Sequence, residues 1–470
     1  MSNIALNIAV TGVQADQTAM DTISQNLSNA NTPGYVAETA NLMANAGGDP
    51  LGVGDGVRVT SVSQASDTLL VTSAQQATGA LAQGTALQQV LQQAQLAFQE
   101  PSSNGLSSDL SSFWQSWDQV ASNPSDPAAR IQTINMAQTV VSDLHQANQQ
   151  LTTVSNNAIS QLSDVVSETN TLLGQVANLN GQISASQSSG LSPNALIDQR
   201  NQLMNQLSKD IGAVGSVQPD GSFQVRAGNV TLVNGNWADS LTMAPAPSTT
   251  TGTPTPPISL VAKQSGGTVS TSSGTAAGLL AGVNSHIPGY QGQLNTVAQQ
   301  LASSVNTLLE KGYTYDPSSG AVAGGTDLFQ TSDGSTTYTA ANITVNPTMA
   351  GTGSTPGNPL LLAAATDPAN AANDGSNAQK IADQWNVPGG PDAQYRQLVQ
   401  TVGQEVSAVN NQVQSQTSVS NAAQQNLQAV TGVDPNTQLV SLMNFQQSYQ
   451  AAAKVISTVD TAMQALMAAV

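Results

Sequence analysis

Few side chains in this sequence could do acid–base, nucleophilic or metal chemistry. Its 470 residues include two histidines, His145 and His286, and no cysteine. The histidines lie far apart, neither belongs to a His-Glu-x-x-His motif, and no Gly-x-Ser-x-Gly elbow presents a serine nucleophile. Each histidine is therefore expected on a polar helix face rather than at a metal ion.

The other candidate groups have structural interpretations as well. Gly52, Gly54 and Gly56 form a glycine-rich turn, but no Walker lysine follows them. The acidic residues are scattered, as expected for groups that confer solubility or cap helices. Trp114 and Trp117 can share one helix face, where they are expected to anchor helix to helix. We therefore predict no catalytic, cofactor-binding or metal-binding residues, no cofactor and no enzymatic activity.

The composition excludes several classes of partner. Only 8% of the residues are charged, where about 25% is usual. The formal net charge of −18 repels phosphates, so nucleic acid is not an expected partner. No stretch approaches the roughly 18 apolar residues of a membrane span.

No cleavable signal peptide is visible, since the first basic residue is Arg58. Such a chain either stays inside the cell or leaves through a dedicated secretion machine.

The secondary-structure elements can be predicted from the periodicity of apolar residues, which is clearest at the two chain ends. Near the C-terminus, apolar residues recur in alternating steps of three and four, which is the heptad seam of a helix that packs on a partner helix. We call these residues the C-terminal seam: Leu442, Phe445, Tyr449, Ala452, Ile456, Val459, Met463, Leu466 and Val470.

The N-terminus keeps the same rhythm, broken only where Asp16 occupies a seam position. The helix should end near residues 28–31, because Thr32 precedes a proline. Thr32, Pro33, Gly34 and Tyr35 then read as a type II turn. The N-terminal seam consists of Leu6, Ala9, Val13, Met20, Ile23, Leu27 and Ala30.

Periodicity alone allows two interpretations of the seams. The two helices could form an ordinary antiparallel pair that closes a monomer, or they could be an assembly surface that several subunits share. In the second case we expect both ends to be largely disordered in the free monomer and to fold on assembly, because a lone helix pair in water is marginal.

Motifs at both ends favour assembly. The stretch ISQNLSNANTPGYVAETANL, whose motif residues are Asn29, Asn31, Thr32, Pro33, Gly34 and Tyr35, resembles the N-terminal signature of the flagellar rod, hook and hook-associated proteins. The tail LVSLMNFQQSYQAAAKVISTVDTAMQALMAAV is similar to the matching C-terminal signature. The two motifs occur at the same ends of the chain, and in the same order, as in the family that they resemble.

Between the ends, the sequence predicts a mainly α protein with inserted β-rich modules. Long helices are expected over most of 77–211, with Asp126 as an N-cap and Gly212 after the last helix. A short hairpin is expected around 56–70, and further helices over 278–310 and 377–430. We predict a terminal coiled-coil domain (1–45 with 431–470), a helical bundle (46–211, 276–312 and 376–430) and β-rich modules (212–275 and 313–375) at the tip.

The middle resembles the hook-associated protein 1 family, which forms the hook–filament junction of bacterial flagella. Three segments carry the resemblance: GLSSDLSSFWQSWDQVASNPSDPAAR, LIDQRNQLMNQLSKDIG followed by DGSFQV, and HIPGYQGQLNTVAQQLASSVNTLLEKGY. Two segments depart from the family pattern, AGVNS before the IPGY motif and TGVDPNTQ before the last helix. In the latter, Asp434 and Pro435 can still begin a helix.

The resemblance implies a structural subunit that is secreted and extracellular, at the hook–filament junction of the flagellum. Its implied partners are copies of itself in a ring or helical assembly, the hook protein, the next hook-associated protein on the filament side, and a cytosolic flagellar export chaperone. It also implies type III export without cleavage. The alternatives are another flagellar axial protein (hook, rod or distal hook-associated) or a surface adhesin or carbohydrate-processing enzyme on a helical stalk.

Overall fold

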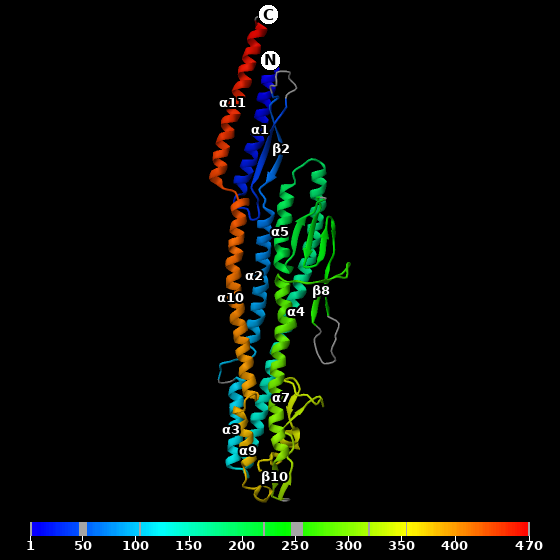
Figure 1. The fold of residues 1–470 in the computed structure, drawn as a ribbon, viewed down its shortest axis with the longest axis vertical. Helices are drawn as coiled ribbons and strands as arrows, with labels where there is room; N and C mark the ends of the chain where they lie inside the picture. Colours follow the sequence, from blue (N-terminus) through cyan, green and yellow to red (C-terminus); the bar gives the residue numbers. More distant parts are fainter. Residues whose placement is uncertain are drawn as a thin grey trace.

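The protein is a long rod whose first and last helices lie side by side at one end (Figure 1). The structure is a computed structural model and describes residues 2–46, 54–102, 105–219, 221–245, 257–317, 320–353 and 355–468. The chain runs from the terminal end to the far tip and back, so that α10 and α11 return alongside α2 and α1. This arrangement confirms the predicted mainly α fold with its ends paired.

Helices make up most of the rod. They are α1 (Ser2–Asn29), α2 (Thr68–Gln95), α3 (Leu106–Ser122), α4 (Pro127–Ser188), α5 (Asn194–Ile211), α6 (Thr275–Ala281), a π-helix (Gly282–His286), α7 (Ile287–Lys311), α8 (Pro347–Ala350), α9 (Ser376–Ala382), α10 (Pro391–Thr431) and α11 (Pro435–Ala468), with short 3₁₀ turns at Pro359–Leu361, Pro368–Asn370 and Asp383–Asn386.

The predicted helix boundaries around α4 and α5 are present. Asp126 caps α4, since its Oδ1 accepts a hydrogen bond from the Ala128 amide at 2.9 Å, and Pro127 takes the first helical position. Gly212 ends α5 with φ +66°, the left-handed conformation that glycine adopts without strain. Helix α4 is 62 residues long, so it extends along much of the rod and gives the β-rich modules a common support.

The helices bury a core that includes an aromatic cluster near the tip. The Phe113 ring centroid lies 4.8 Å from that of Trp114 and 6.3 Å from that of Trp117. Trp117 is fully buried, and Trp114 Nε1 donates a hydrogen bond of 2.8 Å to Asp392 Oδ2 on α10. The tryptophans thus anchor α3 to neighbouring helices, as the sequence predicted.

The first β-rich module lies on the side of the rod against α4, part of the way along it (Figure 1). Gly228, with φ +54°, turns the chain between β4 and β5 at the predicted Gly-Asn pair. The Pro- and Thr-rich segment 246–256 lies outside the described residues. The strands are β3 (Val214–Val217), β4 (Phe223–Ala227), β5 (Val230–Asn234) and β6 (Trp237–Ala238) in one antiparallel sheet, and β7 (Leu241–Pro245), β8 (Ile258–Ala262) and β9 (Thr268–Val269) in another.

The second β-rich module lies at the tip, as predicted, at the end of the rod away from α1 (Figure 1). It consists of three antiparallel pairs: β10 (Tyr313–Asp316) with β11 (Gly320–Ala323), β12 (Phe329–Thr331) with β13 (Ile343–Val345), and β14 (Gly351–Thr352) with β15 (Thr355–Pro356). Phe329 joins this module to the bundle, because its ring centroid lies 6.0 Å from that of Phe113.

Several local expectations need correction. The predicted hairpin around 56–70 instead pairs β1 (Glu38–Ala44) with β2 (Val57–Gln64), and the residues that follow begin α2 with Asp67 as N-cap. The missed strand β1 has alanines and asparagine where β-branched residues usually signal a strand. The helical stretch 278–310 contains a π-helix, and the run 377–430 is divided by a 3₁₀ turn and Gly390. The first module also lies beside α4 instead of at the tip.

Candidate assembly interface

The two chain ends form an antiparallel helix pair. Helix α1 runs toward the bundle and α11 runs back from it (Figure 1), and among the described elements α1 is the main one on which α11 packs. The backbones come close at Gly12, where a Cβ atom would lie 3.9 Å from the Cβ of Ala452. Small residues at this crossing therefore allow the helices to approach.

The C-terminal seam lies on the half-buried face of α11. Its side chains from 442 to 459 are each half-buried, while the residues between them are largely exposed. Met463, farther along, is 42% exposed. The side chain of Leu466 and the whole of Val470 lie outside the described residues. The placement is that of a helix supported on one side only, and the role of this face in assembly remains a prediction.

The N-terminal seam is only partly covered by α11. Ala9 and Ile23 are buried, Leu6 is 37% exposed, and the other four residues are half-buried: Val13, Met20, Leu27 and Ala30. The most buried side of α1 lies beside the predicted seam, at Ala15 and Ala19. The reason is that α1 packs on the β1–β2 hairpin as well as on α11.

Asn26 is a fully buried residue that the seam pattern did not reveal. Its Oδ1 accepts hydrogen bonds from the Glu38 amide at 2.9 Å and from the Tyr35 hydroxyl at 2.8 Å. Its Nδ2 donates to the Glu38 carbonyl at 2.8 Å and to Gln438 Oε1 at 3.0 Å. One amide thus connects α1, β1, the turn after α1 and the first turn of α11. The sequence offered one indication that Asn26 is buried: it is a polar side chain among the small residues that recur along one face of α1.

The motif turn lies directly after α1. Tyr35 donates its amide hydrogen to the Thr32 carbonyl at 3.2 Å and Gly34 has φ +80°, which is the predicted type II geometry. Gln202 of α5 donates from Nε2 to the Pro33 carbonyl at 2.8 Å, and a Cβ on Gly34 would lie 2.6 Å from that nitrogen. The turn is therefore held against the bundle. The remaining motif residues are half-buried or exposed: Asn29 and Asn31.

Two further contacts join the β1–β2 hairpin and the residue before it to the bundle. Ala37 donates its amide hydrogen to the carbonyl of Thr431 at 2.8 Å, at the end of α10. Gln64 Nε2 donates to Asp198 Oδ1 at 2.8 Å. Burial raises the pKa of Asp198 to about 6 and, with the nearby charge of Glu38, raises that of Tyr35 to about 12. The hydrogen bonds of this joint are mostly between uncharged amide, hydroxyl and carbonyl groups, and Asp198 is the carboxyl group among the acceptors.

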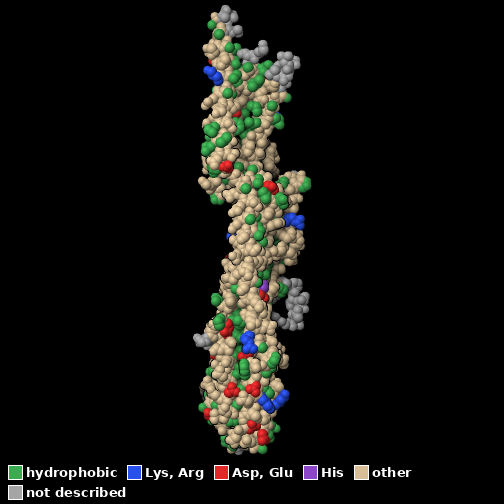
Figure 2. Space-filling view, turned by 60° about the vertical axis from the view of Figure 1, so that its left-hand side comes forward, with side chains coloured by type: hydrophobic (Ala, Val, Ile, Leu, Met, Phe, Trp, Pro, Cys, Tyr) green, Lys and Arg blue, Asp and Glu red, His purple; other side chains and the backbone are tan. Residues whose placement is uncertain are grey.

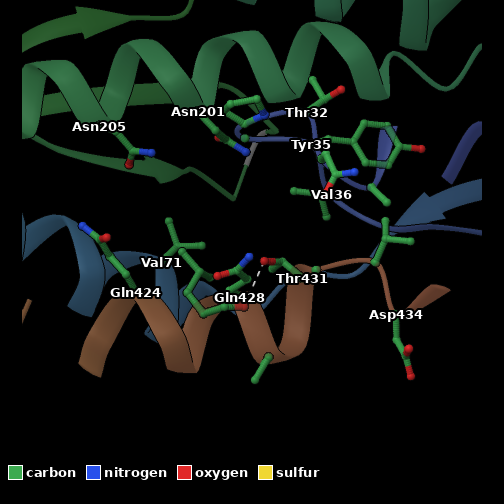
Figure 3. A pocket seen from close by; sticks show the side chains of 18 residues that line it. Thr32, Tyr35, Val36, Val71, Asn201, Asn205, Gln424, Gln428, Thr431 and Asp434 are labelled. Carbon is green, nitrogen blue, oxygen red and sulfur yellow. Dashed lines mark hydrogen bonds between the residues drawn. The ribbon is translucent and has the colours of Figure 1, made fainter. Parts of the chain in front are cut away.

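A pocket of about 600 Å³ opens at this joint. Figure 3 shows Thr32 and Tyr35 lying with Asn201 of α5 on one side and Gln424 and Gln428 of α10 on the other. Among the described residues, its lining consists of amide, hydroxyl and aliphatic groups, with Asp434 as the charged member. Asp434 caps α11, as predicted, because its carboxylate accepts from the Asn436 amide and the Thr437 hydroxyl, which lowers its pKa.

The two histidines do not form a site together. His145 Nε2 lies 2.8 Å from the Ile343 carbonyl oxygen, and His286 Nδ1 lies 2.8 Å from Glu405 Oε2. Within the described residues, no group of three or more His, Cys, Asp or Glu is arranged to hold a metal ion. No helix in the described part of the chain has both the length and the hydropathy needed to cross a membrane.

Comparison with known proteins connects this geometry to one family. The profile of the "Flagellar hook-associated protein FlgK helical domain" matches residues 91–329, just over half of the chain. The profile "Flagella basal body rod protein" matches residues 6–35, and "Flagellar basal body rod FlgEFG protein C-terminal" matches 423–469. These two terminal matches cover α1 with its turn, and α11 with the end of α10.

Individual proteins give the same result. The chain is 27% identical to flagellar hook-associated protein 1 of Salmonella typhimurium, over 98% of this chain and 99% of that protein. It is 31% identical to the protein of that name from Escherichia coli, over 52% and 46% of the two chains. The flagellar hook junction protein FlgK from Burkholderia pseudomallei has the same fold, with a TM-score of 0.61 and 18% identity, over 78% of this chain and 100% of that one. The chain belongs to the flagellar hook-associated protein 1 family.

Proposed function

We propose that this protein is a structural subunit of the hook–filament junction and that it assembles with copies of itself through α1 and α11. The observation that carries the proposal is the exposure of α11. This helix is rich in apolar residues, yet none of its described side chains is buried. An apolar helix with one partner and open sides is suited to packing against neighbouring subunits.

The exposed apolar surface is large enough to matter energetically. Six large side chains of α11 are between 42% and 71% exposed: Leu439, Val440, Met443, Val455, Met463 and Met467. Figure 2 shows hydrophobic side chains spread over the terminal part of the rod with few charges among them. Full burial of one such side chain contributes roughly 1.5–3 kcal/mol, so covering the exposed halves of six would contribute roughly 5–9 kcal/mol. Association costs at least about 4 kcal/mol in lost freedom of motion. Because this cost offsets much of the gain, we expect each subunit to contact more than one neighbour.

Family membership makes this a structural protein of the bacterial flagellum, not an enzyme, which assembles with other flagellar proteins. We further propose that residues 1–45 and 431–470 are the assembly unit. The hook protein would lie on one side of the ring and the next hook-associated protein on the other. The protein would be secreted to the cell exterior by the flagellar type III apparatus. Before export, a cytosolic chaperone would bind its C-terminal region.

A different axial position, in the rod or the hook, is the second candidate. The terminal matches favour it as much as they favour the junction, because both are to rod-protein profiles. The helical middle supports the junction. Immunogold labelling of intact flagella distinguishes the two: label confined to the hook–filament boundary is expected, and label along the hook or within the rod would contradict the junction.

The assembly role is tested by a matched pair of substitutions. Val440 lies on α11, on the side opposite the seam, and is 53% exposed, while Val419 lies on α10 and is 58% exposed. Changing either exposed valine to Asp should alter the stability of the monomer by only about 0.5 kcal/mol. In the assembly, Val440→Asp would bury an unpaired carboxylate, which is strongly unfavourable.

The measurement is the amount of each variant in flagella purified from cells in which it is the sole copy. We expect Val440→Asp to be exported and found in the medium but not in flagella, and Val419→Asp to be incorporated normally. Equal incorporation of both variants would contradict the proposal that α11 is the assembly surface.

A further inference from the structure

A polar pocket of about 600 Å³ lies on the side of the rod, near the C-terminal end of α4. It is formed where the end of α4, the helix α5 and the β3–β6 sheet meet. Its lining includes Asn180 and Ser184 of α4, Arg200 of α5, and Phe223, Gly235 and Asn236 of the sheet. Neither the heptad seams nor the joint uses these residues.

Arg200 is the distinctive member of this lining. Its side chain is 8% exposed, and its guanidinium carbon lies 3.8 Å from the centroid of the Phe223 ring. Nη1 donates to Asn180 Oδ1 at 3.3 Å, whereas Nε has no hydrogen-bond partner among the described residues. No carboxylate of a described residue lies within ion-pair distance of it, since the one ion pair found in the described part joins His286 and Glu405.

The guanidinium is therefore buried, and within the described residues it has one acceptor and no carboxylate partner. Burial lowers the pKa of Arg200 to about 10, which still leaves it protonated at neutral pH. A buried charge normally requires a paired or hydrogen-bonded partner, because removing it from water is costly. The stacking on Phe223 covers one face of the guanidinium and supplies no acceptor.

Arg130, also buried, shows how this chain satisfies an arginine that has only a structural role. It is 1% exposed, and its guanidinium donates to the backbone carbonyls of Pro124, Pro359 and Leu362. All three acceptors come from the chain itself, and Arg130 lines none of the pockets described above. Arg200 has one amide acceptor and faces a cavity.

We propose that the pocket beside Arg200 binds an oxyanion, namely the phosphate or carboxylate group of a small molecule. Such a group accepts charge-assisted hydrogen bonds from a guanidinium, often two in parallel. Ser184, Gln187 and Asn236 also line the pocket and can supply further donors. The net charge of −18 disfavours non-specific anion binding, so affinity at this site would have to come from the local geometry.

The test uses the full chain and two probes, inorganic phosphate and acetate, in equilibrium dialysis at a constant ionic strength of about 0.15 M. Saturable binding of one anion per chain is expected. Phosphate bound more tightly than acetate would indicate a phosphate-bearing ligand, and the reverse a carboxylate-bearing one. Absence of saturable binding by both probes would overturn the proposal.

Three variants locate the site. Arg200→Gln removes the charge, and Ser184→Asp adds a carboxylate to the pocket edge while leaving Arg200 and its packing intact. Both should weaken binding about tenfold or more, which corresponds to roughly 1.4 kcal/mol. Ser160→Asp places the same substitution at an exposed position of α4 outside the pocket, and its affinity should match that of the unmodified chain. Equal binding by Ser184→Asp and Ser160→Asp would overturn the assignment.

A fourth variant addresses Asp220, the acidic residue that directly precedes a pocket residue in the sequence. Asp220 precedes Gly221, a pocket residue, and lies outside the described residues. Asp220→Asn should leave the affinity for phosphate within about twofold of the unmodified chain. If the unmodified chain fails to bind and Asp220→Asn binds, the guanidinium is neutralised within the chain and the proposal is wrong.

Discussion

Asp16 provides the sharpest test of how the terminal helices hold together. It occupies a seam position of α1, is 7% exposed, and its Oδ2 accepts no hydrogen bond from any residue that the structure describes. A buried carboxylate oxygen without a donor is a destabilising feature in an otherwise apolar helix contact. We therefore expect Asp16→Ala to stabilise the terminal helix pair.

The size of the effect follows from two contributions. Removing an unsatisfied buried polar group recovers about 1–3 kcal/mol. Replacing Asp by Ala inside a helix adds up to about 0.7 kcal/mol of intrinsic propensity. Asp21 separates the two, because it lies on the same helix and is exposed, so Asp21→Ala receives only the propensity gain. The free energy of unfolding of the terminal pair should therefore differ between the variants by about 1–3 kcal/mol.

Amide hydrogen exchange of the monomer measures this difference directly. Exchange through opening of α1 should be slower in Asp16→Ala than in Asp21→Ala by about 5- to 150-fold, the factor that corresponds to 1–3 kcal/mol. The amides of α4 report on the bundle and should exchange alike in both variants. The same data test whether both ends are largely disordered in the free monomer, since strong protection of α1 and α11 in the unmodified chain would contradict that hypothesis.

The opposite result would be informative. If the α1 amides of Asp16→Ala exchange as fast as those of Asp21→Ala or faster, then the folded state stabilises the Asp16 carboxylate, and this carboxylate does not destabilise the helix pair. Equal protection of α1 and the bundle in all variants would show that the terminal pair does not open independently of the bundle.

Three other predictions concern the seam, the joint and the bundle. Ile456→Asp, which puts a carboxylate on the face of α11 toward α1, should abolish incorporation into flagella while thermal unfolding of the bundle is unchanged; normal incorporation would count against assembly through the seam. Asn26→Ala leaves part-buried groups of Tyr35, Glu38 and Gln438 unpaired and should destabilise the terminal unit by about 2–4 kcal/mol in denaturant titrations, whereas Asn29→Ala should cost less than about 1 kcal/mol. Burial, together with the hydrogen bond and charge of Asp109, raises the pKa of Asp143 to about 7. The folded state therefore holds this proton more tightly than the unfolded state does. As a result, the free energy of unfolding should fall as the pH rises from about 4 to 7. Asp143→Asn should flatten that dependence when melting temperatures are compared across this range, and an unchanged slope would contradict the assignment.

Motifs and periodicity predicted the elements that depend on local sequence. The type II turn at Thr32–Tyr35, the N-caps at Asp126 and Asp434 and the helix end at Gly212 each follow from the conformational preference of one or two residues. They could be predicted because their energetics are confined to a few neighbouring positions.

The features that were missed depend on neighbours distant in sequence. Strand β1 has weak strand propensity and is held by β2 and by α1. Asn26 looks like one of many amides in this chain until Tyr35, Glu38 and Gln438 are brought around it. The position of the first β-rich module depends on the face of α4 that its strands cover, which no single segment specifies.

Local sequence patterns were enough to predict helices with heptad seams at the chain ends and long helices through most of the middle, and the motifs pointed to a flagellar subunit. They were enough because helix periodicity and turn chemistry are local. Only the folded chain establishes which side of α1 is buried, because both the β1–β2 hairpin and α11 pack on that helix, and that Arg200 has a single acceptor among the described residues. Both depend on groups that meet only when the chain has folded back along its whole length.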